Sequence, residues 1–292
     1  MLKFLETVRV LHLEPTDVCQ AACPQCAREL DPAFDKKIKH YLTVPDLQRI
    51  LPDSVIRRLD KMYMCGNYGD PAASEALSIV DHFRNINSSI TIGMNTNGGI
   101  QASWWWKALG ERLKNPLDYV VFSVDGLEDT NHIYRKNVVW ERVIANAEAF
   151  IRAGGAAHWD MLVFEHNQHQ VDACEQLARK LGFKFFRAKV SRRHNEYPVQ
   201  FLKQPAGWQD PVTLEGNIKC LALEENSLYI SAKGTVHPCC WLGASDGADI
   251  NEFVTIQENW KTNPNAICKK TCSTNNVGSS FTNQWQREVQ LF

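Results

Sequence analysis

Residues 8–30 read VRVLHLEPTDVCQAACPQCAREL, an apolar segment followed by a polar loop that carries three cysteines. The β-branched and apolar residues over 8–15 predict a strand. The three thiols, at Cys19, Cys23 and Cys26, then fall in the loop that leaves this strand. In open α/β sheets and barrels ligands collect at the carboxyl ends of the strands, so thiols placed there call for a chemical explanation.

Short apolar segments alternate with amphipathic helical segments along the first two thirds of the chain. Strands are predicted at 8–15, 61–66, 90–97, 117–126, 158–166 and 183–190. Helical spacing over 140–151 and 174–181 is followed in each case by glycine, as at a helix C-cap. Six strands joined by helices predict right-handed crossovers and a parallel α/β sheet, either doubly wound or curled into a partial barrel.

The 292-residue chain has a formal net charge of −1 and a sequence pI of about 6.7. This charge balance lacks the positive field that binding to a nucleic-acid backbone needs. Glu6 and Arg9 interrupt the apolar residues at the N-terminus, and no run of about 18 apolar residues occurs, so neither a secretion signal nor a membrane span is predicted. We expect a cytoplasmic protein with no nucleic-acid and no membrane partner.

The chain has ten cysteines, and a reducing compartment favours metal-binding or catalytic thiols over disulfides. Three thiols with Cys-x3-Cys-x2-Cys spacing cover three corners of a cubane iron-sulfur cluster and leave the fourth iron open to a non-protein ligand. A structural zinc ion would take four protein ligands. Zinc, or loop thiols with no metal, remain the alternatives. Cys174 lies on the apolar face of a predicted helix and is expected to be a small buried hydrophobic residue.

The loop CQAACPQC (19–26) resembles the cysteine signature of radical S-adenosylmethionine (AdoMet) enzymes, and later segments resemble this family in the same order. CGNYGDPA (65–72) resembles the family's GGEP-like turn, and MNTNGG (94–99) resembles the end of its third strand. FSVDGLEDTNHIYRK (122–136) resembles a Ser-x-Asp-Gly…His-x-x-Arg segment of one subgroup. The resemblance implies a partial (β/α)6 TIM-like barrel over residues 1–200.

The same resemblance implies the ligands of a [4Fe-4S] cluster and of AdoMet. Cys19, Cys23 and Cys26 would bind the cluster. The implied AdoMet-binding residues are Gly66, Gly69, Asp70, Pro71, Asn97, Ser123, Asp125 and Arg135. Backbone carbonyls of the glycine turn would bind the AdoMet amino group, and glycine lets the backbone approach closely. Ser123 and Arg135 would reach its methionyl or ribose part.

Two positions depart from the family pattern. The residue before the third cysteine is usually aromatic and packs against the cofactor, and here it is Gln25. The acidic residue of the GGEP-like turn is Asp70 where glutamate is usual. Neither change removes a cysteine of the signature.

The C-terminal cysteines resemble a second cluster site. The order Cys220, Gly234, Cys239, Cys268 and Cys272 resembles the twitch module, a short relative of the SPASM domain that holds an auxiliary [4Fe-4S] cluster. The segment SLYISAKGTVHPCC (227–240) predicts two short strands around a Lys-Gly turn. We assign 205–292 to this module, with Cys220, Cys239, Cys268 and Cys272 as the ligands. Cys240 could replace Cys239, and a zinc site of four thiolates fits the same spacing.

The family resemblance implies a reaction class. Such enzymes cleave AdoMet reductively to a 5′-deoxyadenosyl radical that abstracts a substrate hydrogen, and an auxiliary cluster can then accept an electron, so that the substrate is oxidised. The implied electron donor is a flavodoxin or ferredoxin. No general acid or base is assigned. A non-catalytic iron-sulfur or zinc-binding module and a zinc hydrolase are the alternatives from other classes.

The substrate remains open at this point. Members of the family with such modules modify peptides or proteins, and a smaller set dehydrogenates amino-cyclitols. Because only 18 residues precede Cys19, we expect either that a separate protein would bind a peptide leader or that the substrate is small. Oxidation of a peptide or protein is the first hypothesis, and dehydrogenation or epimerisation of an aminosugar or amino-cyclitol is the alternative.

Overall fold

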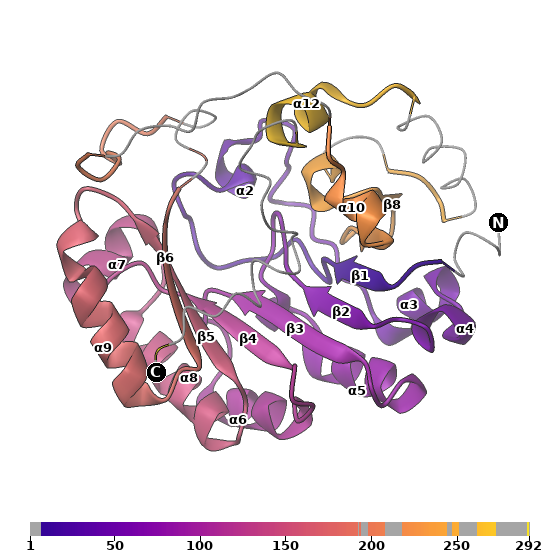
Figure 1. The fold of residues 1–292 in the computed structure, drawn as a ribbon, viewed down its shortest axis with the longest axis horizontal. Coiled ribbons are helices and arrows are strands. Elements are labelled where there is room, and N and C mark those ends of the chain that lie inside the picture. Colours follow the sequence, from indigo (N-terminus) through magenta and orange to yellow (C-terminus); the bar gives the residue numbers. More distant parts are fainter. Residues whose placement is uncertain are drawn as a thin grey trace.

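The computed structural model describes residues 7–191, 193, 198–207, 218–243, 247–250, 262–272 and 291. Its centre is a curved, open sheet with the strand order β6-β5-β4-β3-β2-β1-β7-β8 (Figure 1). The strands are β1 Val10–Leu13, β2 Lys61–Met64, β3 Thr91–Thr96, β4 Tyr119–Ser123, β5 Ala157–Val163, β6 Phe185–Val190, β7 Ser227–Ile230 and β8 Val236–His237. All neighbouring pairs are parallel except β7 and β8. The predicted α/β fold is confirmed.

Helices follow the strands and cover the convex face of the sheet (Figure 1). The longer ones are α3 Val44–Ile50, α5 Ala76–Ile86, α6 Ser103–Arg112, α7 Glu128–Tyr134, α8 Trp140–Arg152, α9 Val171–Leu181 and α12 Ala266–Cys272. The short ones are α2 Ala27–Leu30, α4 Asp53–Ile56, α10 Leu221–Glu224, η1 Pro71–Ala73, η2 Gln168–Gln170 and η3 Cys240–Leu242. As predicted, α9 ends at a left-handed glycine, Gly182, with φ of +88°. None of the helices in the described part of the chain is long and apolar enough to span a membrane.

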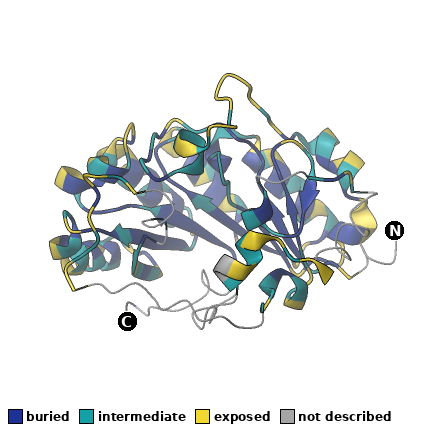
Figure 2. Ribbon diagram, turned by 90° about the horizontal axis from the view of Figure 1, so that it is seen from above, coloured by how far each residue is buried: buried dark blue, intermediate teal, exposed yellow. Residues whose placement is uncertain are grey.

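The two faces of the sheet differ in chemistry because successive side chains of a strand point to opposite faces. Leu11, Met62 and Ile92, which are in register on β1, β2 and β3, belong to the apolar core. One residue further along, His12 and Tyr63 are also in register, and their rings stack with centroids 4.4 Å apart. Figure 2 shows the strands buried between more exposed helices. The polar face therefore lines the interior of the curved sheet.

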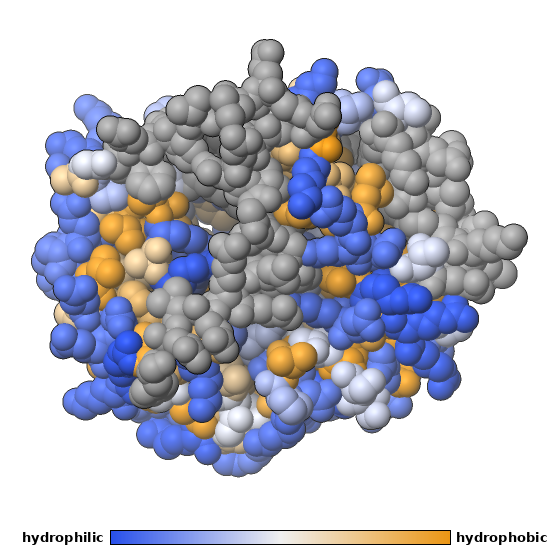
Figure 3. Space-filling model, viewed as in Figure 1, coloured by the Kyte–Doolittle hydropathy of each residue, from blue (hydrophilic) through white to orange (hydrophobic). Residues whose placement is uncertain are grey.

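Aromatic side chains fill the space between the sheet and its helices. Trp106 and Phe122 are fully buried, with ring centroids 5.1 Å apart, and the indole N–H of Trp106 donates to the Ile100 carbonyl at 3.0 Å. Trp104 on the same helix is 68% exposed, so the helix alternates between core and solvent. Cys174 is fully buried in the core, as its helical position predicts. The visible surface over the helices is mainly hydrophilic (Figure 3).

The C-terminal hairpin extends the main sheet. The predicted strands over 227–240 form β7 and β8 on either side of a turn at Lys233 and Gly234. Strand β7 pairs in parallel with β1, from Val10 opposite Ser227 to Leu13 opposite Ile230. This continuation of the sheet beyond β1 was not predicted, because nothing local in a hairpin specifies a third strand beside it. The domain ranges 1–200 and 205–292 stay a prediction.

A buried carboxylate holds the start of β4 to its neighbours. Asp118 is 2% exposed and accepts hydrogen bonds from the Ile92 N–H at 2.8 Å and the Asn115 N–H at 2.9 Å. It also forms an ion pair with Arg84 at 2.6 Å. We expect Asp118→Asn to lower the free energy of unfolding by about 3 kcal/mol, because it leaves a largely buried cation without its counter-charge.

A surface ion pair provides the matched control. The carboxylate of Asp81 is 48% exposed and binds Arg112 at 2.9 Å, so Asp81→Asn should cost less than about 1 kcal/mol. Urea unfolding of both variants measures the difference. If the two variants lose the same free energy of unfolding, the burial of Asp118 does not strengthen its ion pair.

Candidate functional site

A cavity of about 260 Å³ lies at the carboxyl edge of the parallel strands. The predicted site residues that line it are Cys19, Cys23, Cys26, Gly66, Gly69, Asp70, Asn97, Ser123 and Arg135. The fold thus brings together loops that follow four different strands. Pro71 begins η1 behind this wall, and Asp125 lies behind Arg135, so neither residue lines the cavity.

The N-terminal thiols lie close enough together to influence one another. Burial raises the pKa of Cys23 to about 11, and its neighbour Cys26 adds to the rise. Burial also raises the pKa of Cys19, with further contributions from Asp70, Cys23 and Cys26. Thiols in this setting keep their protons unless a metal takes the proton's place. Among the described residues, no three His, Cys, Asp or Glu side chains converge tightly enough to hold a single metal ion.

The turn after β2 requires glycine at two positions. A Cβ at Gly69 would lie 1.9 Å from the Thr16 carbonyl oxygen, and a Cβ at Gly66 would lie 2.2 Å from the Gly69 carbonyl oxygen. Both contacts are with backbone, which cannot move aside as a flexible side chain could. The turn therefore packs directly against the segment that leads into the cysteine loop, and it presents main chain to the cavity.

Glu14, which the sequence did not single out, holds this turn in place. Its carboxylate is 2% exposed and accepts hydrogen bonds from the N–H groups of Tyr68 at 2.7 Å and Gly69 at 3.3 Å. The hydroxyl of Tyr229 on β7 also donates to it. Burial raises the pKa of Glu14 to about 6, and hydrogen bonds from Tyr229 and from the backbone of the turn only partly offset that rise. Glu14 thus ties the glycine turn to the C-terminal hairpin.

Asp70 connects the glycine turn to the end of β3. It is buried and accepts hydrogen bonds from the Thr96 hydroxyl at 3.0 Å and from the Asn97 N–H at 2.7 Å. The Asn97 amide also donates to Asp70 at 2.6 Å and lies 3.5 Å from the sulfur of Cys19. Burial raises the pKa of Asp70. The aspartate therefore positions Asn97 beside the first cysteine.

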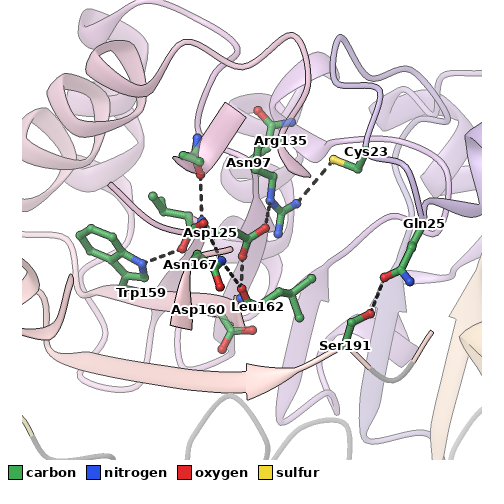
Figure 4. Close-up of polar contacts among 12 residues, drawn as sticks. Cys23, Gln25, Asn97, Asp125, Arg135, Trp159, Asp160, Leu162, Asn167 and Ser191 are labelled. Atoms are coloured by element: carbon green, nitrogen blue, oxygen red, sulfur yellow. Dashed lines mark hydrogen bonds and ion pairs between the residues drawn. The ribbon is translucent and has the colours of Figure 1, made fainter. Parts of the chain in front are cut away.

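Arg135 and Asp125 form a buried ion pair beside Cys23 (Figure 4). The Arg135 Nε atom donates to Asp125 at 2.6 Å, and Nη1 lies 3.9 Å from the Cys23 sulfur. The second carboxylate oxygen of Asp125 accepts from the Leu162 N–H at 2.6 Å. Because Asp125 is fully buried and both of its oxygens are engaged, it positions Arg135, while the guanidinium reaches the cavity wall.

Gln25 replaces the expected aromatic residue with a polar connection to β6. It is fully buried, and its side-chain oxygen accepts a hydrogen bond from the Ser191 hydroxyl at 2.7 Å (Figure 4). Its backbone carbonyl accepts from Arg193 at 2.8 Å. The cysteine loop is thereby anchored to the end of the sixth strand.

Further cavity residues come from the inner face of the strands and from the turn after β2, and were not predicted as site residues. They are His12, Tyr63, Cys65, Asn67, Asn95, Asp160, Leu162 and Lys189. The Asp160 carboxylate contacts Arg187 at 2.6 Å and Lys189 at 2.5 Å, and these cations lower its pKa although burial alone would raise it. Burial lowers the pKa of His12 to about 4. Alternation of polar with apolar residues along each predicted strand was the signal that could have found them.

The C-terminal thiols form a second group. Burial raises the pKa of Cys239 to about 12, and Cys220 and Cys268 add to the rise. Burial likewise raises the pKa of Cys268, and Cys272 and Cys220 add to the rise. Cys240 differs, because it lines the main cavity and its carbonyl accepts a hydrogen bond from the Asn67 amide at 2.7 Å. Cys239 therefore interacts electrostatically with Cys220 and Cys268, whereas Cys240 lines the main cavity.

Comparison with known proteins shows a shared fold at low sequence identity. Neither protein-family models nor curated proteins match this chain. Among solved structures, Streptococcus suis SuiB bound to S-adenosylmethionine has a TM-score of 0.60 and 15% identity, covering 96% of this chain and 75% of SuiB. The protein anSMEcpe with bound AdoMet has a TM-score of 0.62 and 15% identity, covering 89% and 82%. BtrN in complex with AdoMet and 2-DOIA has a TM-score of 0.53 and 13% identity, covering 96% and 98%.

The raised pKa of Glu14 predicts a pH-dependent contribution to stability. Between pH 4.5, the ordinary pKa of a glutamate, and about 6, the raised pKa of Glu14, the folded protein binds a proton that the unfolded chain has lost. The contribution of Glu14 to the free energy of unfolding should therefore fall by about 2 kcal/mol as the pH rises through this window. Glu14→Gln should remove this contribution, so that the variant gains stability relative to wild type between pH 4.5 and 7.

Urea unfolding at several pH values measures the difference between the two proteins. Glu165→Gln is the matched control, because this carboxylate is 54% exposed on the surface. The control curve should run parallel to that of wild type. If the free energy of unfolding of Glu14→Gln also follows that of wild type at every pH, the raised pKa of Glu14 is contradicted.

Proposed function

We propose that this chain is a radical AdoMet enzyme that oxidatively modifies its substrate. The observation that carries the proposal is the meeting of Cys19, Cys23 and Cys26 with the glycine turn at the carboxyl edge of the sheet. The three structural neighbours described above, each with AdoMet bound, have the same fold and support this reading. An enzyme of this kind would work in the reducing environment of the cytoplasm.

The residues of the cavity fit a [4Fe-4S] cluster and AdoMet. In a cubane each thiolate binds a different iron, so three neighbouring thiols serve it without converging on one metal ion. Gly66 and Gly69 line the cavity, and their close contacts with this chain's own backbone require glycine, so the turn would offer main-chain groups to a ligand. When bound, these groups together supply the one-electron chemistry that removes a hydrogen atom from a substrate.

The chain's own side chains would orient AdoMet. Asn97 is held by Asp70 beside Cys19, and the Ser123 hydroxyl lines the same cavity. Arg135 brings a permanent positive charge to the wall and suits the AdoMet carboxylate, since Asp125 fixes the guanidinium from behind. The apolar Leu162 offers a surface for the adenine ring. These groups are preorganised by buried hydrogen bonds, so little would need to move on binding.

We further propose that Cys220, Cys239, Cys268 and Cys272 hold an auxiliary [4Fe-4S] cluster that accepts an electron, as in a twitch or SPASM module. Support comes from the mutual influence of these thiols on their pKa values. Hydrogen bonds connect the C-terminal module to the surroundings of the main cavity, among them one from Tyr229 to Glu14 and one from Asn67 to the Cys240 carbonyl. An electron leaving a substrate in the cavity would therefore have the module close by.

A peptide or protein is the first substrate hypothesis. SuiB has been solved bound to its precursor peptide SuiA, and anSMEcpe with the peptide Cp18Cys, so this fold can present its cavity to a peptide. A small molecule is the second candidate, and one observation favours it. BtrN, solved with 2-DOIA, and this chain cover nearly the whole of each other, at 98% and 96%.

A flavodoxin or ferredoxin would supply the electron.

Matched cysteine variants test the proposed AdoMet chemistry. Cys23→Ala removes a thiol that lines the cavity. Cys174→Ala removes a thiol on the buried face of α9. After anaerobic reconstitution, wild type and Cys174→Ala should hold about eight irons per chain and release 5′-deoxyadenosine and methionine with dithionite. Cys23→Ala should hold about four irons and release neither. Equal product from the two variants would refute the proposal.

A second pair of variants tests the ligands of the C-terminal module. Cys239→Ala should lower the iron content by about four per chain, because it would remove one of the four proposed ligands, and Cys239 interacts with Cys220 and Cys268. Cys240→Ala should keep the iron, because its thiol lines the main cavity. Iron and zinc analysis of the two purified proteins measures this. Loss of iron only in Cys240→Ala would reverse the assignment, and stoichiometric zinc in wild type would replace the cluster with a zinc site.

A further inference from the structure

A second hollow of about 420 Å³ lies outside the main cavity, between the segment before α3 and the turn that joins β7 to β8. We call it the basic groove and define it by Lys39, Tyr41, Arg49, Ile50 and Lys233. None of these residues lines the main cavity. The groove is therefore a separate surface, and neither the cysteine chemistry nor AdoMet binding accounts for it.

The groove concentrates positive charge on a chain whose formal net charge is −1. Three permanent cations line it against one carboxylate, Asp46, which is itself paired with Arg49. Lys39 and Lys233 are exposed and have no ion-pair partner within the described part of the chain. The net positive charge of this surface would attract an acidic partner.

Apolar side chains are exposed among these cations. Tyr41 is 48% exposed and Ile38 is 56% exposed, although both are large enough to bury in a core. Ile50 adds apolar surface to the wall of the groove. Exposed aromatic and aliphatic side chains bordered by charge are typical of protein interfaces, and a lone anion would not need them.

The groove adjoins the segments that carry both sets of cysteines. Residues 40–42 run antiparallel to 15–17, with the Tyr41 and Thr16 bridge and a hydrogen bond from the Leu42 N–H to the Pro15 carbonyl at 2.9 Å. Asp17, which binds His40 at 2.5 Å, stands two residues before Cys19. On the other side, a Cβ at Gly234 would lie 3.3 Å from Ile50, so the hairpin turn that precedes Cys239 packs against the groove.

We propose that the basic groove is the docking site of an acidic one-electron donor protein. This inference rests on the proposed function. The donor loses one electron and the cluster at Cys19, Cys23 and Cys26 gains it, so no other oxidant or reductant is needed. A donor seated there would lie against the segment that leads directly into the cysteine loop. An acidic peptide substrate is the weaker occupant, because its reacting group has to enter the other cavity.

Charge reversal tests the docking by affinity alone. The probe is a bacterial flavodoxin, an acidic protein, titrated anaerobically against the reconstituted enzyme. Lys39→Glu combined with Lys233→Glu should weaken binding about tenfold, and the affinity of wild type should fall as salt is added. The matched control is Lys180→Glu combined with Lys184→Glu, which makes the same charge change at exposed lysines near the β6 edge. Equal weakening in both double variants would overturn the proposal.

AdoMet cleavage with two reductants separates this inference from the proposed function. With flavodoxin as the reductant, the groove variant should cleave AdoMet at a rate about tenfold below that of the control variant, which matches its loss of affinity. With dithionite as the reductant, the two variants should cleave AdoMet at the same rate. If wild type cleaves no AdoMet with either reductant, the proposed function fails, while the titration still decides the docking. If an acidic peptide binds with the same lysine dependence and flavodoxin does not bind, the groove belongs to the peptide.

Discussion

Buried carboxylates that follow one strand and bind the backbone beyond the next strand hold the site of this protein together. Glu14, after β1, accepts hydrogen bonds from the turn after β2. Asp70, in that turn, accepts from the end of β3, and Asp125, after β4, accepts from the Leu162 N–H on β5. A carboxylate that is buried away from water needs such hydrogen-bond donors, and the backbone that carries these donors is held in place by the bonds. The loops around the cavity are therefore fixed relative to one another before any ligand binds.

This constraint explains how the fold combines a stable core with a polar interior. The outer face of the sheet packs apolar side chains such as Leu11 and Met62 against the helices, which supplies the hydrophobic stabilisation. The inner face places His12 and Tyr63 in stacked contact and leaves room for ligands. Parallel strands are usually apolar on both faces. Here the inner face carries polar side chains that line the cavity in place of some of those apolar contacts.

The C-terminal hairpin belongs to this arrangement as much as to the cysteines that follow it. Strand β7 pairs with β1, and its Tyr229 donates to the same Glu14 that holds the glycine turn. The hairpin turn also forms one wall of the basic groove, where Lys233 lies. The two proposed clusters and the proposed docking site therefore share one structural support.

The α/β class, the six parallel strands, the hairpin at 227–240 and the cysteine loop after the first strand could all be predicted from the amino-acid sequence, because periodicity and residue spacing are local properties. The sequence also brought out Asn97, Ser123 and Arg135, which the fold places on one cavity wall. The tertiary contacts were needed to show that Asp160 lines that cavity, that Glu14 holds the glycine turn beside it, and that Asp125 lies behind Arg135. These facts depend on which backbone groups meet across distant strands, and a buried charge is stabilised by such long-range partners, which no local pattern encodes.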